Sequence, residues 1–152
     1  GDGVLVYAVE TAIQLAITES RESLREIYAE AYTQPEICEY ICQKTARENA
    51  KFFSRYNEDW GECDFYEAEI GSSGMMRSFM LRRCDMYFTL KKKTARFLRM
   101  ALDVYHVPRD VADAAIETVM NMDIEATASA VMLQLFSMLE MRFDFRFSDT
   151  TQ

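Results

Sequence analysis

The stretch Val4-Leu-Val-Tyr-Ala-Val-Glu-Thr-Ala-Ile-Gln-Leu-Ala-Ile-Thr18 decides the fold of this chain. Its apolar residues follow two adjacent helical stripes, Leu5, Ala8, Val9, Ala12 and Ala16 in one and Val6, Ile13 and Ile17 in the other. A helix that is apolar on so much of its circumference is usually enclosed by other elements. Because Glu10 and Gln14 interrupt the run, it falls short of the roughly 18 clean apolar residues of a membrane span. We therefore expect a central buried helix and no membrane insertion.

The composition around this helix favours an all-α protein. The chain has 152 residues, of which only 5 are Gly and 2 are Pro, too few for the many turns of a sandwich or barrel. Apolar residues make up 49% and charged residues 28%, as in globular proteins. At this length a core can form without disulfide or metal support. Residues 1–152 are therefore predicted to form a single domain, a bundle of about six to seven helices.

Local signals place the remaining helices. Apolar periodicity with capping residues predicts a short helix from just after Ser20 to about Tyr32, and further helices over about residues 33–55, 65–83, 90–105, 109–121 and 124–146. Thr33 and Glu36 read as a capping box with Pro35 in the first turn, and Thr89 and Asp123 read as N-caps. Within 65–83, Gly71 and Gly74 each cost about 1 kcal/mol relative to Ala, so either something compensates or the helix breaks there.

The net charge and the cysteine content restrict which binding partners and which cellular compartment we expect. With 17 basic and 25 acidic residues the net charge is −8, a poor starting point for binding nucleic acid. The basic run Lys91-Lys-Lys93 with Arg96 and Arg99 is expected to form a solvated face, with a patch that meets DNA phosphates from the flank as the alternative. Four cysteines in a chain without a secretory leader favour free thiols and a cytoplasmic location.

The usual catalytic and metal-binding signatures are missing from the sequence. A single histidine, His106, excludes paired E-x-x-H motifs, H-E-x-x-H and a zinc finger, and neither a phosphate-binding loop nor a G-x-S-x-G motif occurs. His106 is expected at a helix C-terminus, where its charge would suit the helix dipole. Cys38 and Cys42 are expected to be buried, inert thiols. We expect no enzyme activity, no catalytic residue, no metal and no cofactor.

One helix offers a candidate ligand site. Glu69, Ser73 and Arg77 align at i, i+4 and i+8, either as a solvent face or as the polar edge of a pocket in which Arg77 pairs an anion or Glu69 a cation. The flexible thioethers of Met76 and Met80 suit an adaptable pocket as well as ordinary core packing. These five residues are the predicted effector-pocket candidates.

The last predicted helix has more apolar surface than packing against one other element would cover. Two adjacent stripes run along it, and such a surface indicates a further contact, for example with another chain. Its predicted homodimer contacts are Val131, Met132, Leu135, Phe136 and Leu139. The small Gly71 and Gly74 are further candidates for close approach in a dimer.

Three stretches together resemble a known family. Ser23–Pro35, Phe65–Met80 and Phe97–Pro108 look like parts of the C-terminal regulatory region of TetR-type bacterial transcriptional regulators, and the similarity extends from about Val4 to Phe143. The resemblance implies a helical domain that dimerises and holds a small effector, while a separate N-terminal helix-turn-helix of about 50 residues reads DNA. The chain begins Gly-Asp-Gly and no such segment precedes Val4, so it is expected to hold the regulatory half only.

Two other classes of function stay open. A stand-alone helical interaction module would use the apolar last helix to bind a different protein and would need no small-molecule site. An enzyme is the weakest alternative, because carboxylates are plentiful but no nucleophile, metal or cofactor signature accompanies them.

Overall fold

Helix α1 lies at the centre of the molecule and contacts each of the other six helices. The computed structural model describes residues 2–149, with side chains for residues 2–138. Its elements in chain order are α1 (Gly3–Ser20), α2 (Glu22–Ala31), α3 (Pro35–Phe53), the 3-10 turn η1 (Ser54–Tyr56), α4 (Glu62–Leu81), α5 (Leu90–Val104), α6 (Arg109–Met120) and α7 (Ile124–Asp149). Over residues 2–149 every regular element is a helix, which confirms the all-α prediction and the central place of the first helix.

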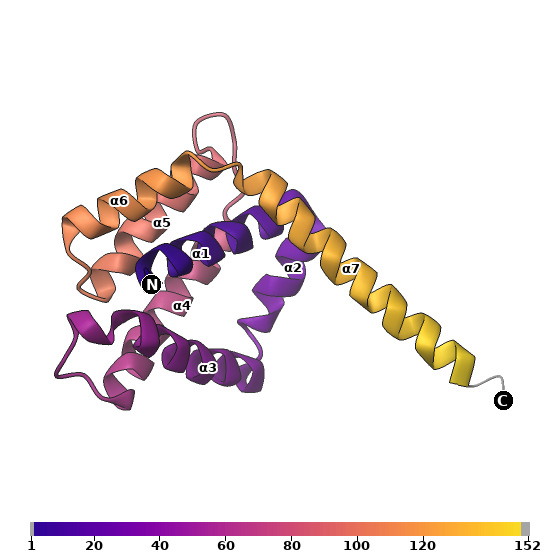
Figure 1. Ribbon diagram of the computed structural model, residues 1–152, viewed down its shortest axis with the longest axis horizontal. Coiled ribbons are helices and arrows are strands. Elements are labelled where there is room, and N and C mark those ends of the chain that lie inside the picture. The colour runs from indigo at the N-terminus through magenta and orange to yellow at the C-terminus, as the bar shows by residue number, and fades with distance from the viewer. Residues whose placement is uncertain (1, 150–152) are drawn as a thin grey trace.

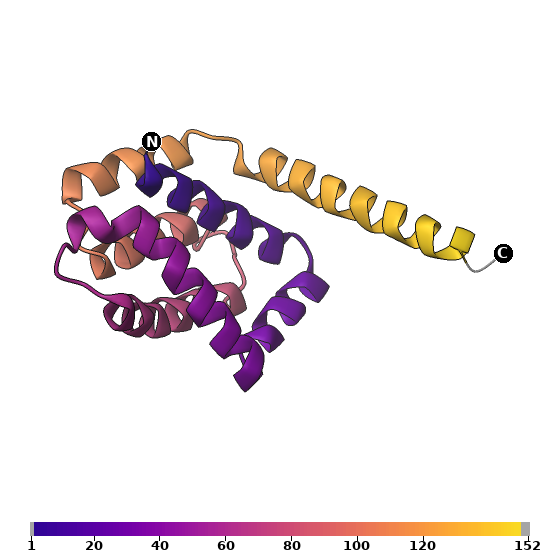
Figure 2. The same ribbon diagram turned by 60° about the horizontal axis from the view of Figure 1, so that its bottom comes forward.

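The helices surround α1 on several sides. Figures 1 and 2 show α3 and α4 on one side of it, α5 and α6 on another, and α2 beyond its C-terminal end. The core side chains that α1 contributes are Val4, Tyr7, Ala8, Ala12 and Leu15. They pack with Phe53, Phe65, Met80, Phe97, Leu98, Leu102 and Tyr105 from the surrounding segments. No described helix has an apolar stretch of the length that crossing a bilayer requires.

Capping side chains start several helices as the sequence predicts. Thr89 Oγ1 accepts a hydrogen bond from Lys92 N at 3.3 Å to begin α5. Asp123 Oδ1 accepts one from Ala126 N at 3.1 Å at the start of α7. Both predicted N-caps are confirmed, because a cap depends only on residues within one turn.

The predicted capping box at the start of α3 does not form. Thr33 Oγ1 donates to Glu30 O at 2.7 Å and so completes the end of α2 instead. Helix α3 begins at Pro35, with Gln34 as an N-cap that makes no side-chain hydrogen bond. The box was a wrong prediction because the preceding helix ends too close to leave Thr33 available.

Helix α5 ends in a Schellman motif in which His106 occupies the left-handed position. His106 has φ of 55°, Val107 N donates to Leu102 O, and His106 N donates to Asp103 O, both at 3.1 Å. Pro108 then starts α6. The position is thus occupied by a residue other than Gly. The His106 side chain has a hydrogen-bond partner there, because its Nδ1 lies 2.6 Å from Asn57 Oδ1.

Helix α4 runs without a break through both of its internal glycines. Gly71 and Gly74 are exposed, and a Cβ atom built at either would meet nothing within 4 Å. Within the chain, therefore, neither glycine is required by a close helix contact. The low helix propensity of the two glycines is offset by packing on the opposite face of α4, where Phe65, Met76 and Met80 are buried.

The predicted solvated basic face is wrong for one of its residues. Lys93 is 1% exposed, and its Nζ donates to Glu19 Oε2 at 3.0 Å and to the carbonyl of Arg82. Arg25, also buried, pairs with the same Glu19 oxygen at 3.0 Å. Burial by itself raises the pKa of the Glu19 carboxyl, but hydrogen bonds from Cys84 N, Lys93 and Arg25 outweigh it and lower that pKa to about 2.

Helix α7 leaves the body of the molecule after its first turns (Figures 1 and 2). Ala128 is buried against Ala16 and Ile17 of α1, and Val131 and Met132 pack at the edge of that cluster. Further along, the exposed fractions reach 70% for Leu133, 52% for Leu135, 44% for Phe136 and 51% for Met138. The proximal part of the predicted dimer face is thus partly used within the chain, and Leu139 lies outside the described side chains.

Candidate functional site

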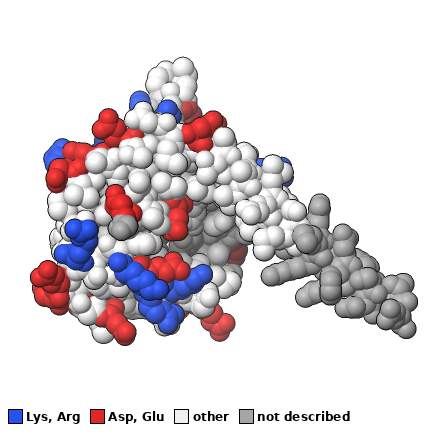
Figure 3. Space-filling view, viewed as in Figure 1, with Lys and Arg blue, Asp and Glu red and all other residues white. Residues whose placement is uncertain are grey.

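A cavity of about 410 Å³ opens between α1, α2, α3, α4 and α5. This volume lies in the range of roughly 300–1,000 Å³ that is typical of small-molecule sites. Its walls are formed by Tyr7, Glu10, Thr11, Gln14, Ile27, Tyr28, Ala31, Tyr32, Ile41, Thr45, Glu48, Asn49, Phe52, Glu69, Ser72, Met76 and Phe97. In the space-filling view the surface is hollowed between α1, α2 and α3, with acidic side chains at the edge of the hollow (Figure 3).

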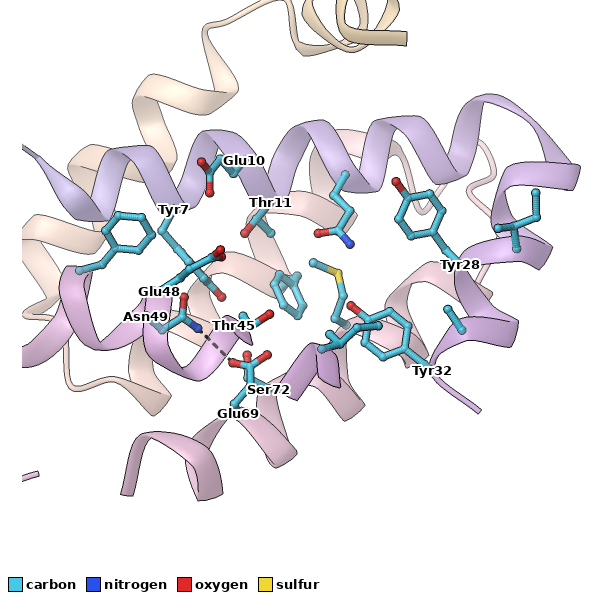
Figure 4. A pocket seen from close by; sticks show the side chains of 17 residues that line it. Tyr7, Glu10, Thr11, Tyr28, Tyr32, Thr45, Glu48, Asn49, Glu69 and Ser72 are labelled. Carbon is cyan, nitrogen blue, oxygen red and sulfur yellow. Dashed lines mark hydrogen bonds between the residues drawn. The ribbon is translucent and has the colours of Figure 1, made fainter. Parts of the chain in front are cut away.

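Helical periodicity brings these side chains to one place. Figure 4 shows Tyr7 and Thr11 on α1 opposite Glu48 and Asn49 on α3, with Tyr28 and Tyr32 toward the other end. Residues three, four or seven apart share a helix face, so α1, α2, α3 and α4 each present several side chains to the same space, and α5 adds Phe97. Helix α4 contributes the deepest stripe, which consists of Glu69, Ser72 and Met76.

Glu69 is the central polar group of this site. Its side chain is 4% exposed, and Oε2 accepts hydrogen bonds from Asn49 Nδ2 at 3.0 Å and from Tyr105 OH at 2.8 Å. Asn49 Nδ2 also lies 3.0 Å from Tyr105 OH, so the three groups form a closed buried triangle. Both donors to the carboxyl are neutral, and the structure places no cation in hydrogen-bond contact with it over the described residues.

Burial raises the pKa of the Glu69 carboxyl to about 7. The hydrogen bonds from Tyr105 and Asn49 act in the opposite direction, and the negative charge of Glu48 adds to the increase. The carboxyl group therefore changes its charge near neutral pH, where a ligand that prefers one form can shift the balance.

Phenol groups around Glu69 stay protonated. Burial, and then the charge of Glu69, raises the pKa of Tyr7 and of Tyr105 above the ordinary value. The same two causes raise the pKa of Tyr32 to about 12. These hydroxyl groups consequently act as hydrogen-bond donors and acceptors rather than as bases.

Two of the five predicted pocket residues line this cavity, namely Glu69 and Met76. Ser73 instead lies against Cys42, with Oγ 3.5 Å from Sγ, and donates to Ile70 O at 3.2 Å. Met80 is fully buried in the core, and its carbonyl accepts from Arg25 Nη1 at 3.3 Å. Arg77 lies on a separate groove between α2 and the end of α4.

The helical repeat explains why the predicted stripe diverges from the cavity. At 100° per residue, position i+8 is rotated by about 80° from position i, so Arg77 turns away from the direction of Glu69. Positions i+3 and i+7 lie on the other side of Glu69 at about −60° and −20°, and these are Ser72 and Met76. The groove that holds Arg77 also contains Arg25, Arg82 and Arg83 with three glutamates, and Glu22 pairs with Arg83 at 2.8 Å.

Several cavity residues were not among the sequence candidates. Asn49 carried a usable signal, because it falls in register with the apolar stripe Cys42, Ala46 and Phe53 of α3, where a polar residue needs a buried partner. Tyr105 and Tyr7 read as ordinary core aromatics from periodicity alone. The hydroxyl partners of Tyr105 are Asn49 and Glu69, which come from other helices and depend on the tertiary arrangement.

The other chemically suggestive residues lie outside the cavity. His106 is beside Asn57 and Trp60. Cys42 is buried, and burial raises the pKa of its thiol, whereas Cys38 is half-buried and Cys63 is exposed. Over the part of the chain with described side chains, no three His, Cys, Asp or Glu residues gather in a way that could hold a metal ion.

Comparisons with known proteins add no assignment. No family model matches the chain, and no curated protein and no solved structure shows a significant match to it.

Proposed function

We propose that this chain is the ligand-sensing and dimerisation domain of a TetR-type bacterial transcriptional regulator. The observation that carries the proposal is the cavity between helices α1 to α5, which has the size of a ligand site and a buried carboxyl group in its wall. The resemblance of the three sequence stretches supports the family, and the all-helical architecture is compatible with it. Regulation itself involves no catalytic step.

The mechanism that follows is a population shift. A ligand in the cavity contacts helices from α1 to α5, so it favours the arrangement of those helices that it fits best. In the full regulator this choice would change the separation of two DNA-reading helix-turn-helix segments, one joined to each copy of the domain. Operator affinity then falls or rises with ligand concentration, and direct contact between ligand and DNA is not needed.

The exposed part of α7 supports the dimerisation half of the proposal. Leu133, Leu135, Phe136 and Met138 are exposed apolar side chains distributed around α7 beyond the body of the molecule. Several exposed large apolar side chains close together on one helix are typical of a segment that packs against another protein surface. A second copy of α7 would supply a surface of the same composition, as a two-fold interface requires.

The same α7 surface also favours a second candidate function. A stand-alone interaction module would use Leu135 and Phe136 to bind a different protein, and the cavity would then be a packing defect without a ligand. Native mass spectrometry separates the two candidates, because it reports both the number of 17.7 kDa subunits and any retained ligand mass. A dimer that carries extra mass supports the regulator, and a monomer without extra mass supports the module.

A thermal-shift screen with a diverse small-molecule library tests the cavity directly. A ligand at 100 times its dissociation constant stabilises the folded state by about 2.7 kcal/mol. Thr45→Trp places an indole at the cavity wall and should abolish the shift, whereas Lys44→Trp, at an exposed position of the same helix, should preserve it. A library that stabilises neither the parent chain nor the Lys44→Trp variant would contradict the ligand-sensing function.

A further inference from the structure

The charged groups that line the cavity all have the same sign. Glu10 and Glu48 are exposed at its mouth, on α1 and α3, and Glu69 is buried in the wall that α4 contributes. Among the described residues, no Lys or Arg lines the cavity. The basic side chains of α3 lie elsewhere, with Arg47 and Lys51 on a different groove that faces α4. The electrostatic field along the cavity therefore attracts cations.

One oxygen of the Glu69 carboxyl group is free for a ligand. Asn49 and Tyr105 both donate to Oε2, and no described residue donates to Oε1. The residue is 4% exposed and belongs to the cavity wall. Oε1 is not among the fully buried unpartnered atoms, so it is accessible from the cavity, where a positively charged donor can form a charge-assisted hydrogen bond with it.

The remaining walls suit the apolar part of an organic molecule. Met76 and Phe97 are buried on one side of the cavity, and the half-buried rings of Tyr28, Tyr32 and Phe52 lie around the rest. Aromatic faces also attract ammonium groups, by about 0.5–2 kcal/mol depending on desolvation. A bare metal ion fits poorly here, because the described residues offer no cluster of three suitable ligands.

We propose that the cavity binds an organic monocation, with its charged nitrogen at Oε1 of Glu69 and its apolar part against Met76 and Phe97. This inference rests on the proposed ligand-sensing function and narrows it to one chemical class. Glu10 and Glu48 attract the cation to the mouth, and Glu69 holds it at the end of the cavity. Neutral ligands would leave the negative rim without a role, and anions would be repelled by it.

Three naphthalene probes of matched shape test the charge preference. They are 2-naphthylmethylammonium, the neutral 2-naphthalenemethanol and the anionic 2-naphthoate, each followed at pH 8 by its own fluorescence during titration. We expect the cation to bind at least about tenfold more tightly than the alcohol, and the anion to bind most weakly. An alcohol that binds as well as the cation would overturn the inference and leave the ligand-sensing function in place.

Two substitutions on α4 test whether Glu69 is the residue that causes the preference for the cation. Glu69→Gln keeps the size and one acceptor oxygen of the side chain, and it should weaken cation binding about tenfold while changing alcohol binding less than twofold. Glu67→Gln makes the same change of charge at an exposed position two residues away and should leave all three affinities as they are. Equal losses in the two variants would overturn the assignment to Glu69.

A second variant keeps the test decisive if Glu69→Gln fails to fold. The exposed pair Glu10→Gln and Glu48→Gln should reduce cation affinity about threefold and leave the alcohol unchanged, with a smaller difference at high salt. Unchanged cation affinity in this double variant would overturn the role of Glu10 and Glu48 at the mouth.

The probes and the library together distinguish failure of this inference from failure of the proposed function. If none of the three probes binds while the diverse library yields another ligand, only the cation inference is overturned. If the library fails as well, the ligand-sensing function falls with it.

Discussion

Glu69 is a carboxyl group enclosed with two neutral donors, Asn49 and Tyr105. Ionisation inside this enclosure loses solvation that water would provide, and the two hydrogen bonds restore only part of it. The residue thus stays protonated at pH values where an exposed glutamate is charged. Its protonation state consequently links the stability of the fold to pH and to whatever occupies the cavity.

The first prediction concerns the pH dependence of stability. The pKa of Glu69 is about 7 in the folded state and 4.5 in its ordinary state, so between these values the folded chain holds a proton that the unfolded chain has lost. Stability therefore falls as pH rises from about 4.5 to 7 and then levels off, by up to about 3 kcal/mol from this group. Glu69→Gln should remove that fall.

Urea unfolding at pH 5 and pH 8 measures the difference. From pH 5 to pH 8 the free energy of unfolding of the parent chain should fall, and that of Glu69→Gln should not. The variant should therefore be more stable relative to the parent at pH 8 than at pH 5. Glu67→Gln, at an exposed position on the same helix, should follow the parent at both. Parallel stability curves for the parent and Glu69→Gln would show that Glu69 has no raised pKa.

At this scale the sequence could identify residue types but not their partners. The pattern around Glu69 indicated a polar stripe on an apolar helix, and Glu69 and Met76 do line the cavity. It could not show that Tyr105, 36 residues away, would donate to Glu69. Such a contact depends on how two helices are rotated about their axes, and a single sequence carries little information about that rotation.

Helix ends were predicted well where one turn of chain contains the whole cause. Thr89 and Asp123 begin α5 and α7 as expected, and Pro108 separates α5 from α6. The capping box predicted at Thr33 was wrong because the end of α2 competes for its hydroxyl group. The solvent-exposed position predicted for Lys93 was wrong for a different reason. Its position four residues before the buried Phe97 placed it on the core face, but its neighbours Lys91 and Lys92 made the segment look like a solvent face.

The second prediction concerns the charge cluster that joins the helices. Lys93 of α5 and Arg25 of α2 both contact Glu19 near the end of α1, and Lys93 also reaches the carbonyl of Arg82 after α4. Lys93→Met keeps the apolar stem and leaves Glu19 with Arg25 and the backbone N–H of Cys84. We expect a loss of roughly 2–3 kcal/mol, because the variant removes one of the two cations that contact Glu19 and the Lys93 hydrogen bond to the Arg82 carbonyl.

Chemical denaturation with Lys91→Met as the control tests this prediction. Lys91 is exposed, so the control removes the same charge and should change stability by less than about 0.5 kcal/mol. A Lys93→Met variant as stable as the control would mean that the cluster contributes only to the alignment of the helices.

The whole molecule consists of a bundle around α1 and one helix that extends beyond it (Figure 2). Periodicity predicted the bundle, because it needs only apolar stripes that find partners within the chain. The same reasoning left α7 with more apolar surface than one chain could cover, and the exposed Leu133 and Leu135 agree with that excess. What covers the surface is beyond the information in one chain.

The third prediction concerns assembly. Replacing both Leu135 and Phe136 with Asp places two charges on the exposed part of α7 and should convert a dimer to monomers, each of 17.7 kDa. Native mass spectrometry or sedimentation measures the result. As a control, Gln134→Asp with Ser137→Asp adds the same charge at exposed polar positions of the same helix and should preserve the dimer. An unchanged mass in the Leu135 and Phe136 variant would remove this face from the interface.

The central helix gives these sites a common element. Tyr7, Thr11 and Gln14 of α1 face the cavity, while Ala16 and Ile17 near its end support Ala128 of α7. If a ligand repositions α1, it also changes how α7 is presented to a second copy. Thermodynamic reciprocity then requires that association of two copies alter ligand affinity by the same factor by which the ligand alters association. The cell's concentration of the protein would thus set its sensitivity to the ligand, and a dilute population would respond over a different range of ligand from a concentrated one.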